Sequence, residues 1–272
     1  MRVCIAANLC VMAFCAGYLA LGIEASGMTW LQAFAATVVG YFMADLASGF
    51  VHWGMDTWFD ERLFGRAVWI AREHHTHPRH ILGYGFLEQA TLGSAPSAVF
   101  IGAAALGTAL FPLSAATCGL MVVWLLIAIC LFFGTSFHNL CHRRPRSRLV
   151  RLAQKGRLLV PPTDHWAHHR GDQTIRYCVI NGWANHLCDP LRVWRGLEWL
   201  VERLTGAEPR RDDVDWQRRY CETGRSMPAL RHPSPTGVRQ AGFIAPGLGA
   251  SMPSHSAPFR SEDPRARRRR NQ

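Results

Sequence analysis

The chain has 272 residues, of which 49% are hydrophobic, and its formal net charge is +11 with histidine counted as neutral. The hydrophobic residues stand in long blocks rather than at a regular period, which argues against a purely water-soluble protein. The nine cysteines contain no Cys-x-x-Cys pair, so neither a Cys-type zinc site nor a disulfide framework is indicated. The basic residues form no nucleic-acid-binding motif, and we expect them to meet anionic lipid headgroups and no nucleic acid.

Four apolar blocks are long enough to cross a bilayer, which takes about 20 residues of helix. They cover residues 3–23, 30–50, 90–111 and 115–137. The first block, which follows Arg2, could instead be a cleaved signal peptide, but its length and its cysteines favour a retained helix. We therefore expect an all-α membrane protein with four transmembrane helices and, beyond them, a cytosolic histidine-rich helical cap.

The basic residues predict how this protein lies in the membrane. Arginine and lysine near helix ends favour the cytoplasmic side, and here they fill residues 62–79 and the chain after Arg143, whereas the links 24–29 and 112–114 have none. This places both termini, the 51–88 loop and the region after Phe137 in the cytoplasm, at the inner membrane if the source is bacterial.

The chain after the fourth block divides into a helical part and a tail. Residues 193–204 alternate apolar and charged side chains at a helical period, which predicts an amphipathic helix that lies on the membrane or packs against the cytosolic region. Pro, Ser, Gly and Arg dominate from about Met227 onward. We expect three segments: residues 1–28 with the first transmembrane helix, a main domain at 29–213, and a basic, disordered tail at 214–272.

Nine histidines fall into four clusters near these apolar blocks. The clusters are His52, then His74, His75 and His77, then His138 and His142, and finally His165, His168 and His169. Residues three or four apart share one face of a helix, so these imidazoles can converge. Imidazole is a common ligand of iron, zinc and copper. Because the topology assigns all four clusters to the cytoplasmic side, the sequence predicts a metal site at a membrane surface.

Longer motifs carry a resemblance to a known family. They are Asp45-x-x-Ser48-Gly49-x-x-His52-Trp53-x-x-Asp56, Arg72-Glu73-His74-His75-x-x-Pro78, His138-x-x-x-His142, His165-x-x-His168-His169, Tyr177-Cys178, Gly182-Trp183-x-Asn185 and Leu204-Thr205-Gly206-x-x-Pro209-Arg210-x-Asp212-Asp213. From about Tyr41 to Asp213 the chain resembles the lipid desaturase family, which includes plasmanylethanolamine desaturases, CarF and Kua proteins and a plant plastid desaturase that acts on phosphatidylglycerol.

The resemblance implies a cofactor and a ligand set. Such enzymes are thought to use a di-iron centre, so we expect two Fe per chain, O2 as co-substrate and electrons from an external carrier such as cytochrome b5 or ferredoxin. The histidines at the matching positions are His52, His74, His75, His138, His142, His165, His168 and His169. Eight histidines suffice for two metals with about four ligands each, whereas a structural zinc takes only about four in total.

Other polar residues have less defined roles. Asp56, four residues after His52, either orients a ligand imidazole from outside the ligand set, which we favour, or binds metal directly. Asn185 either helps to hold a metal-bound water or serves as a capping or turn residue. His77 and His80 have no matching position in the family, and we expect them to face solvent. We expect His186 and His232 to be bystanders as well.

The resemblance implies the introduction of a double bond into an alkyl or acyl chain of a phospholipid in the bilayer. The leading hypothesis is the conversion of plasmanylethanolamine to plasmenylethanolamine, and the nearest alternative is desaturation of an acyl chain of a phospholipid such as phosphatidylglycerol. The animal plasmanylethanolamine enzymes have histidines where this chain has Tyr84 and either Asp164 or Arg157, so the resemblance constrains the chemistry more than the substrate. Alternatives of another class are a zinc-dependent membrane hydrolase and a non-catalytic metal-binding membrane protein.

Overall fold

The computed structural model describes residues 2–143, 147–170 and 173–216, and within these ranges the chain is helical and contains no strand. The elements are α1 (Arg2–Ala25), α2 (Trp30–Thr57), α3 (Glu61–Phe64), α4 (Arg66–Thr76), the 3-10 helix η1 (His80–Gly83), α5 (Phe86–Leu110), α6 (Ala115–Phe132), α7 (Gly134–His142), α8 (Arg148–Lys155), α9 (Pro162–His168), α10 (Asn185–Cys188) and α11 (Val193–Thr205). The all-α prediction is confirmed.

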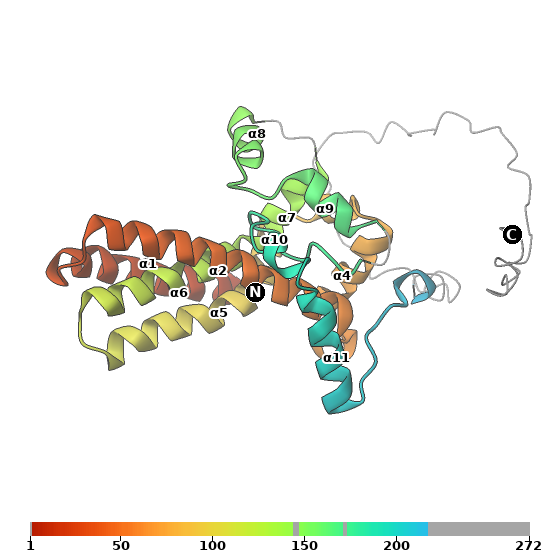
Figure 1. Cartoon of the computed structure of the whole chain (residues 1–272), viewed down its shortest axis with the longest axis horizontal. Helices are drawn as coiled ribbons and strands as arrows, with labels where there is room; N and C mark the ends of the chain where they lie inside the picture. Colours follow the sequence, from red (N-terminus) through yellow and green to blue (C-terminus); the bar gives the residue numbers. More distant parts are fainter. Residues whose placement is uncertain (1, 144–146, 171–172, 217–272) are drawn as a thin grey trace, which may run out of the picture. The chain divides into compact units, whose positions relative to one another are not determined.

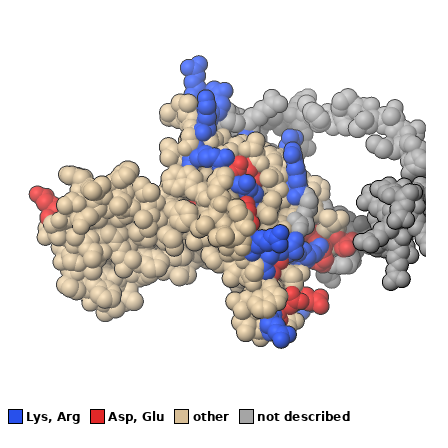
Figure 2. Space-filling model, in the orientation of Figure 1, with Lys and Arg blue, Asp and Glu red and all other residues tan. Residues whose placement is uncertain are grey.

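Four helices, α1, α2, α5 and α6, are long and apolar enough to cross a membrane, as predicted. Helix α6 contacts the other three, and the four run alongside one another in Figure 1. Charged side chains are nearly absent from the face of this bundle seen in Figure 2 and gather over the helices beyond one end of it. The structure thus separates a lipid-compatible bundle from a polar cap.

Local capping interactions mark the residues at which α2 and α5 begin. Thr29 precedes α2 and its hydroxyl accepts the N–H of Gln32, while the Gln32 side chain accepts the N–H of Thr29. Helix α5 begins at Phe86, four residues earlier than the apolar block predicts, because the Glu88 carboxylate accepts the N–H of Gly85. Caps of this kind, reciprocal at α2 and one-sided at α5, satisfy N–H groups at the start of a helix that would otherwise be unpaired.

The fourth apolar block does not form one helix to residue 137, as expected from hydropathy, but breaks after Phe132. Phe133 leaves helical geometry at φ −91° and ψ 2°, and α7 starts at Gly134. At the break, Gly93 of α5 lies so close to the carbonyl oxygens of Leu131 and Phe132 that a Cβ would clash with them. The break gives α7 a start of its own, and this helix carries His138 and His142.

A loop at residues 177–184 is fastened to one face of α2. Asp45, which is fully buried, accepts four backbone N–H groups at 2.9–3.0 Å, from Ile180, Asn181, Gly182 and Ala184. Ser48, one turn further along α2, accepts the N–H of Val179 at 3.1 Å. Hydrogen bonds to a buried carboxylate are strong, so this ladder sets the position of the loop beside the next turn of α2, which carries His52.

Helix α11 packs on the cap through Trp194, whose ring lies 5.2 Å from that of Tyr177 and 5.4 Å from that of Phe50. Trp199 and Leu204 on the same helix remain exposed. One face of α11 therefore packs against the cap, which is one of the two alternatives predicted for this helix. The predicted disordered tail lies mostly outside the described residues, from residue 217 onward.

Candidate metal centre

All eight histidines of the matching set converge, from α2, α4, α7 and α9 and the residue that follows α9. They form two groups, and within each group the candidate ligand atoms lie within 4.8 Å of one another. The five-histidine group consists of His74, His138, His142, His165 and His169. The histidine–aspartate group consists of His52, His75, His168 and Asp56. Asp56 thus lies among the candidate ligands.

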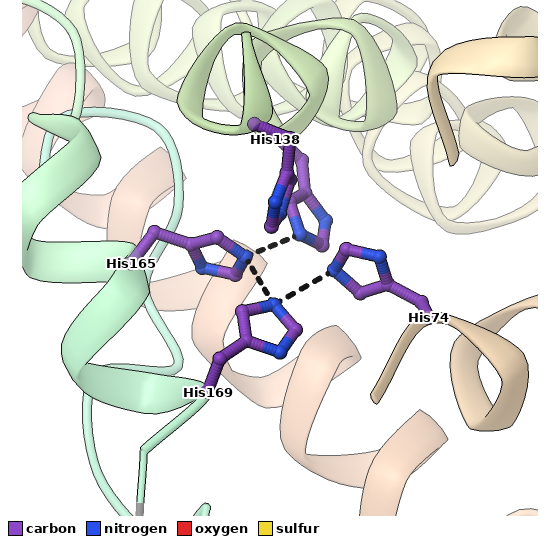
Figure 3. A group of neighbouring side chains, drawn as sticks. His74, His138, His165 and His169 are labelled. Carbon is purple, nitrogen blue, oxygen red and sulfur yellow. Dashed lines mark hydrogen bonds between the residues drawn. The ribbon is translucent and has the colours of Figure 1, made fainter. Parts of the chain in front are cut away.

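In the five-histidine group the Nε2 atoms face a common point. Nε2 of His165 lies 2.7 Å from Nε2 of His138 and 2.9 Å from Nε2 of His169, and Nε2 of His169 lies 3.0 Å from Nε2 of His74. Figure 3 shows these four rings pointing toward one another, His165 and His169 from α9 and its C-terminal end, His138 from α7 and His74 from α4. A neutral imidazole has one N–H and one lone pair, so mutual hydrogen bonds cannot satisfy several facing nitrogens at once.

Several ring nitrogens in this group have no hydrogen-bond partner within the described chain. Both nitrogens of His142 are buried and unpaired, as are Nδ1 of His74, His165 and His169. Buried polar atoms normally have a partner, because desolvation without one costs free energy. A metal ion bound between these imidazoles would take the lone pairs of the Nε2 atoms that lie 2.7–3.0 Å apart, and it would give the buried His142 ring a partner. The donor set therefore fits a bound metal.

The electrostatics of the five-histidine group keep the imidazoles neutral. Burial, followed by repulsion from neighbouring histidines, lowers the pKa of His142 to about 3 and that of His169 to about 2. The same causes hold the pKa values of His74, His138 and His165 well below the usual value. Neutral imidazole is the form that binds metal, so these residues are ready to act as ligands.

In the histidine–aspartate group, one carboxylate oxygen lies opposite three imidazoles. Oδ2 of Asp56 is 3.2 Å from Nε2 of His52, 3.3 Å from Nε2 of His75 and 3.5 Å from Nε2 of His168. Nε2 of His75 and Nε2 of His168 are themselves 3.4 Å apart. Three nitrogens and one oxygen from four side chains thus meet around one small volume.

Each imidazole of this group also has an acceptor for its other nitrogen. The Nδ1–H of His52 donates to the Tyr177 carbonyl at 2.9 Å, and that of His168 donates to the Ile175 carbonyl at 2.7 Å. The Nδ1–H of His75 donates to Oδ2 of Asp213 at 2.7 Å. Donation through Nδ1 fixes the tautomer and turns the Nε2 lone pair toward Asp56. Metal-binding histidines commonly have such an acceptor on the nitrogen away from the metal.

Asp213 is a site residue whose role the sequence did not reveal, although it ends the last matching motif. Its carboxylate contacts His75 and lies 3.0 Å from Nε of Arg72, a buried side chain that also pairs with Asp212. Although burial lowers the pKa of His75, the carboxylates of Asp56 and Asp213 raise it to about 10. A positive charge at His75, from a proton or a nearby metal ion, is therefore stabilised.

The two groups adjoin each other. The ring centroids of His52 and His138 are 5.2 Å apart, and those of His165 and His168 are 5.6 Å apart. Protein centres with two metals place them about 3.5–4 Å apart. Adjacent ligand groups at these ring separations are compatible with such a pair.

The other residues singled out in the sequence lie outside both groups. The Asn185 amide donates to the carbonyl of Cys178 at 2.9 Å and accepts the N–H of Cys178 at 3.0 Å, which is the turn-forming role considered above. His77, His80 and His186 are exposed, as expected of bystanders. His232 lies outside the described residues.

The chain is similar to known lipid desaturases. Residues 41–212 match the family model of the lipid desaturase domain. The chain is 30% identical to plasmanylethanolamine desaturase 1 of Mus musculus over 190 residues, which cover 67% of this chain and 69% of the mouse protein. It is 31% identical over 192 residues to plasmanylethanolamine desaturase of Myxococcus xanthus, covering 68% and 66% of the two chains.

A plant relative matches as well. The chain is 28% identical over 193 residues to the chloroplastic fatty acid desaturase 4 of Arabidopsis thaliana, covering 66% of this chain and 56% of the plant protein. No solved structure matches the chain. The family match spans more than half of the sequence and contains all eight clustered histidines, so the chain belongs to the lipid desaturase family.

Proposed function

We propose that this membrane lipid desaturase uses a di-iron centre and O2 to introduce a double bond into a phospholipid chain, converting plasmanylethanolamine to plasmenylethanolamine. The reaction removes two hydrogen atoms from adjacent carbons of the alkyl chain. Two further electrons and two protons complete the reduction of O2 to two molecules of water. The electrons come from an external carrier such as cytochrome b5 or ferredoxin.

The observation that carries this proposal is the pair of adjoining ligand groups beside the membrane helices. The five-histidine group would hold one iron, and His52, His75, His168 and the Asp56 carboxylate would hold the other, with Asp56 as a direct ligand. The position of Oδ2 opposite three Nε2 atoms supports direct binding by Asp56. When bound, the metals supply the oxidising power for an unactivated C–H bond, which no side-chain acid or base has.

The protein's own residues position the ligands. The carbonyls of Tyr177 and Ile175 and the Asp213 carboxylate fix three imidazoles through Nδ1. Asn185 supports the first of these, because its amide bonds to the backbone of Cys178, next to Tyr177. Because both atoms of its amide bond to Cys178, the proposed role of Asn185 is to position the 177–185 loop and not to hold a metal-bound water.

Orientation follows from charge. We propose that both termini and the metal centre face the cytoplasm, because basic residues concentrate on that side of the helices. A soluble or membrane-bound electron carrier reaches the centre from the same side. The bilayer supplies the phospholipid substrate.

The choice of substrate rests on the similarity to the plasmanylethanolamine desaturases of Mus musculus and Myxococcus xanthus. A second candidate, desaturation of an acyl chain of a phospholipid such as phosphatidylglycerol, is favoured by the similarity to the plant fatty acid desaturase 4. The two reactions give different products, an acid-labile vinyl ether in the first case and an unusual acyl double bond in the second.

The test is lipid analysis of cells that contain plasmanylethanolamine and no desaturase of their own. Expression of the full chain under oxygen should produce acid-labile vinyl ethers, and expression of the His138→Ala variant should not. An acyl double bond without vinyl ethers would select the second candidate. Unchanged lipids with a correctly inserted, iron-loaded protein would contradict both.

A further inference from the structure

A cavity of about 200 Å³ lies between α2, α4, α5 and the junction of α6 and α7. Most of its lining is apolar, including Val51, Ile70, Leu92, Pro96 and Leu131. Of its lining residues, Asp56 alone carries a carboxylate, and no lysine or arginine takes part. We call this cavity the apolar slot.

One end of the apolar slot is formed by the candidate metal ligands. His74 and His138 come from the five-histidine group, and His52 and Asp56 come from the histidine–aspartate group. The slot therefore meets the boundary between the two groups. A molecule in the slot would present its inner end to both metals.

The remainder of the slot is built from helices that can span the membrane. Val51 lies on α2, Leu92, Ala95 and Pro96 lie on α5, and Leu131 lies near the end of α6. Ala95 and Phe64, which also line the slot, are exposed on the protein surface. The slot thus reaches a surface of the helices that the bilayer would cover.

A second cavity, of about 300 Å³, touches the centre from another direction and differs in chemistry. Its lining includes His75, Arg210, Arg211 and Asp213 as well as Asp56. An alkyl chain in that cavity would desolvate several charged groups without pairing them, at a considerable free-energy cost. Of the two cavities, the apolar slot is the one whose lining matches a hydrocarbon chain.

We propose that the apolar slot holds the alkyl chain of one lipid molecule, with the carbons next to its ether oxygen between His52 and His138 and the rest of the chain leading toward the bilayer beside Ala95. This inference rests on the proposed function and adds the place where the reacting chain binds. A chain that moves from the bilayer into the slot exchanges one apolar environment for another, so it avoids the desolvation cost that the charged cavity would impose.

Small residues leave room for the lipid chain in the apolar slot. Ala71 lines the slot on α4, one turn before His74, and Ala95 lines it at the exposed edge. Ala71→Phe would fill the slot near the metals, and Ala95→Trp would cover its edge. Ala98, on the same helix as Ala95, is exposed and does not line the slot, so Ala98→Trp is the matched control.

The experiment uses the full chain in membranes with a 1-alkyl phosphatidylethanolamine that carries a photoreactive diazirine in its alkyl chain. Peptide mapping after irradiation should locate the label on residues 64–74, 92–96 or 131–138. Ala71→Phe and Ala95→Trp should lower labelling and product formation about tenfold or more, as expected for a lost fit in an apolar pocket. Iron content should stay at the wild-type level in both variants, and Ala98→Trp should behave as wild type.

The outcomes separate this inference from the proposed function. Labels confined to other surfaces, or unchanged labelling and product in both slot variants, would overturn the slot while leaving the desaturase intact. Specific labelling of the slot that the two variants abolish would support it, even if the wild-type chain formed no vinyl ether. Loss of iron in Ala71→Phe would make Ala95→Trp, which lies outside the ligand helices, the deciding variant.

Discussion

The two ligand groups differ in how the protein holds their imidazoles. In the histidine–aspartate group every histidine donates Nδ1–H to a fixed acceptor, and a carboxylate lies among the Nε2 atoms. In the five-histidine group several ring nitrogens have no partner, and no carboxylate takes part. The histidine–aspartate group is therefore oriented by the surrounding protein, whereas the five-histidine group depends on packing and on the metal itself.

The largest expected effect comes from His165→Ala. Nε2 of His165 faces both His138 and His169, so its loss should disrupt the five-histidine group. We expect desaturated product to vanish and iron to fall from about two to about one per chain, because the other group keeps its ligands. Iron quantification and lipid analysis measure both effects. His186→Ala, at an exposed histidine, is the control, and full activity of His165→Ala would refute the assignment.

Asp56→Asn tests the feature that distinguishes the histidine–aspartate group. The amide keeps the shape but removes the negative charge opposite His52, His75 and His168. We expect the iron of this group to be lost and that of the five-histidine group to remain, which spectroscopy of the residual iron would detect. Asp60→Asn, at the exposed N-cap of α3, should retain both irons. If Asp56→Asn also retains both, the carboxylate is not a ligand.

A smaller effect is expected of Asp213→Asn, which weakens the acceptor that holds His75. Loss of an outer partner of a metal ligand typically lowers metal affinity about 10- to 100-fold. Titration of metal-free protein with Fe(II) measures this, and Asp213→Glu should recover part of the loss. Asp212→Asn, which removes a partner of Arg72 but no contact to His75, should change the affinity less. Equal losses in both variants would indicate a structural role only.

The four membrane spans and the convergence of the histidines could be predicted from the sequence. The four spans follow from hydropathy alone, because each contains an apolar run of bilayer length. The convergence of the eight histidines could be predicted from helical spacing within each cluster together with the predicted topology, which assigns all the clusters to one side of the membrane. Both features depend on local sequence, which is why they could be read without a structure.

Other features depend on contacts between distant segments. His75 and Asp213 are 138 positions apart, so no spacing rule links them. The break after Phe132 lies where Gly93 of α5 packs closely against the end of α6, a contact that hydropathy does not detect. For Asp56 the sequence favoured an outer role, whereas the position of its Oδ2 among three Nε2 atoms supports direct binding, because the fold brings α4 and α9 to the end of α2.

The most direct test of a two-metal desaturase is metal analysis of the purified full chain, combined with Mössbauer spectroscopy after growth on 57Fe. We predict about two irons per chain, in two distinguishable environments, one with a carboxylate ligand and one with histidines alone. About one zinc per chain, with little iron, would contradict it and favour a zinc-dependent membrane hydrolase.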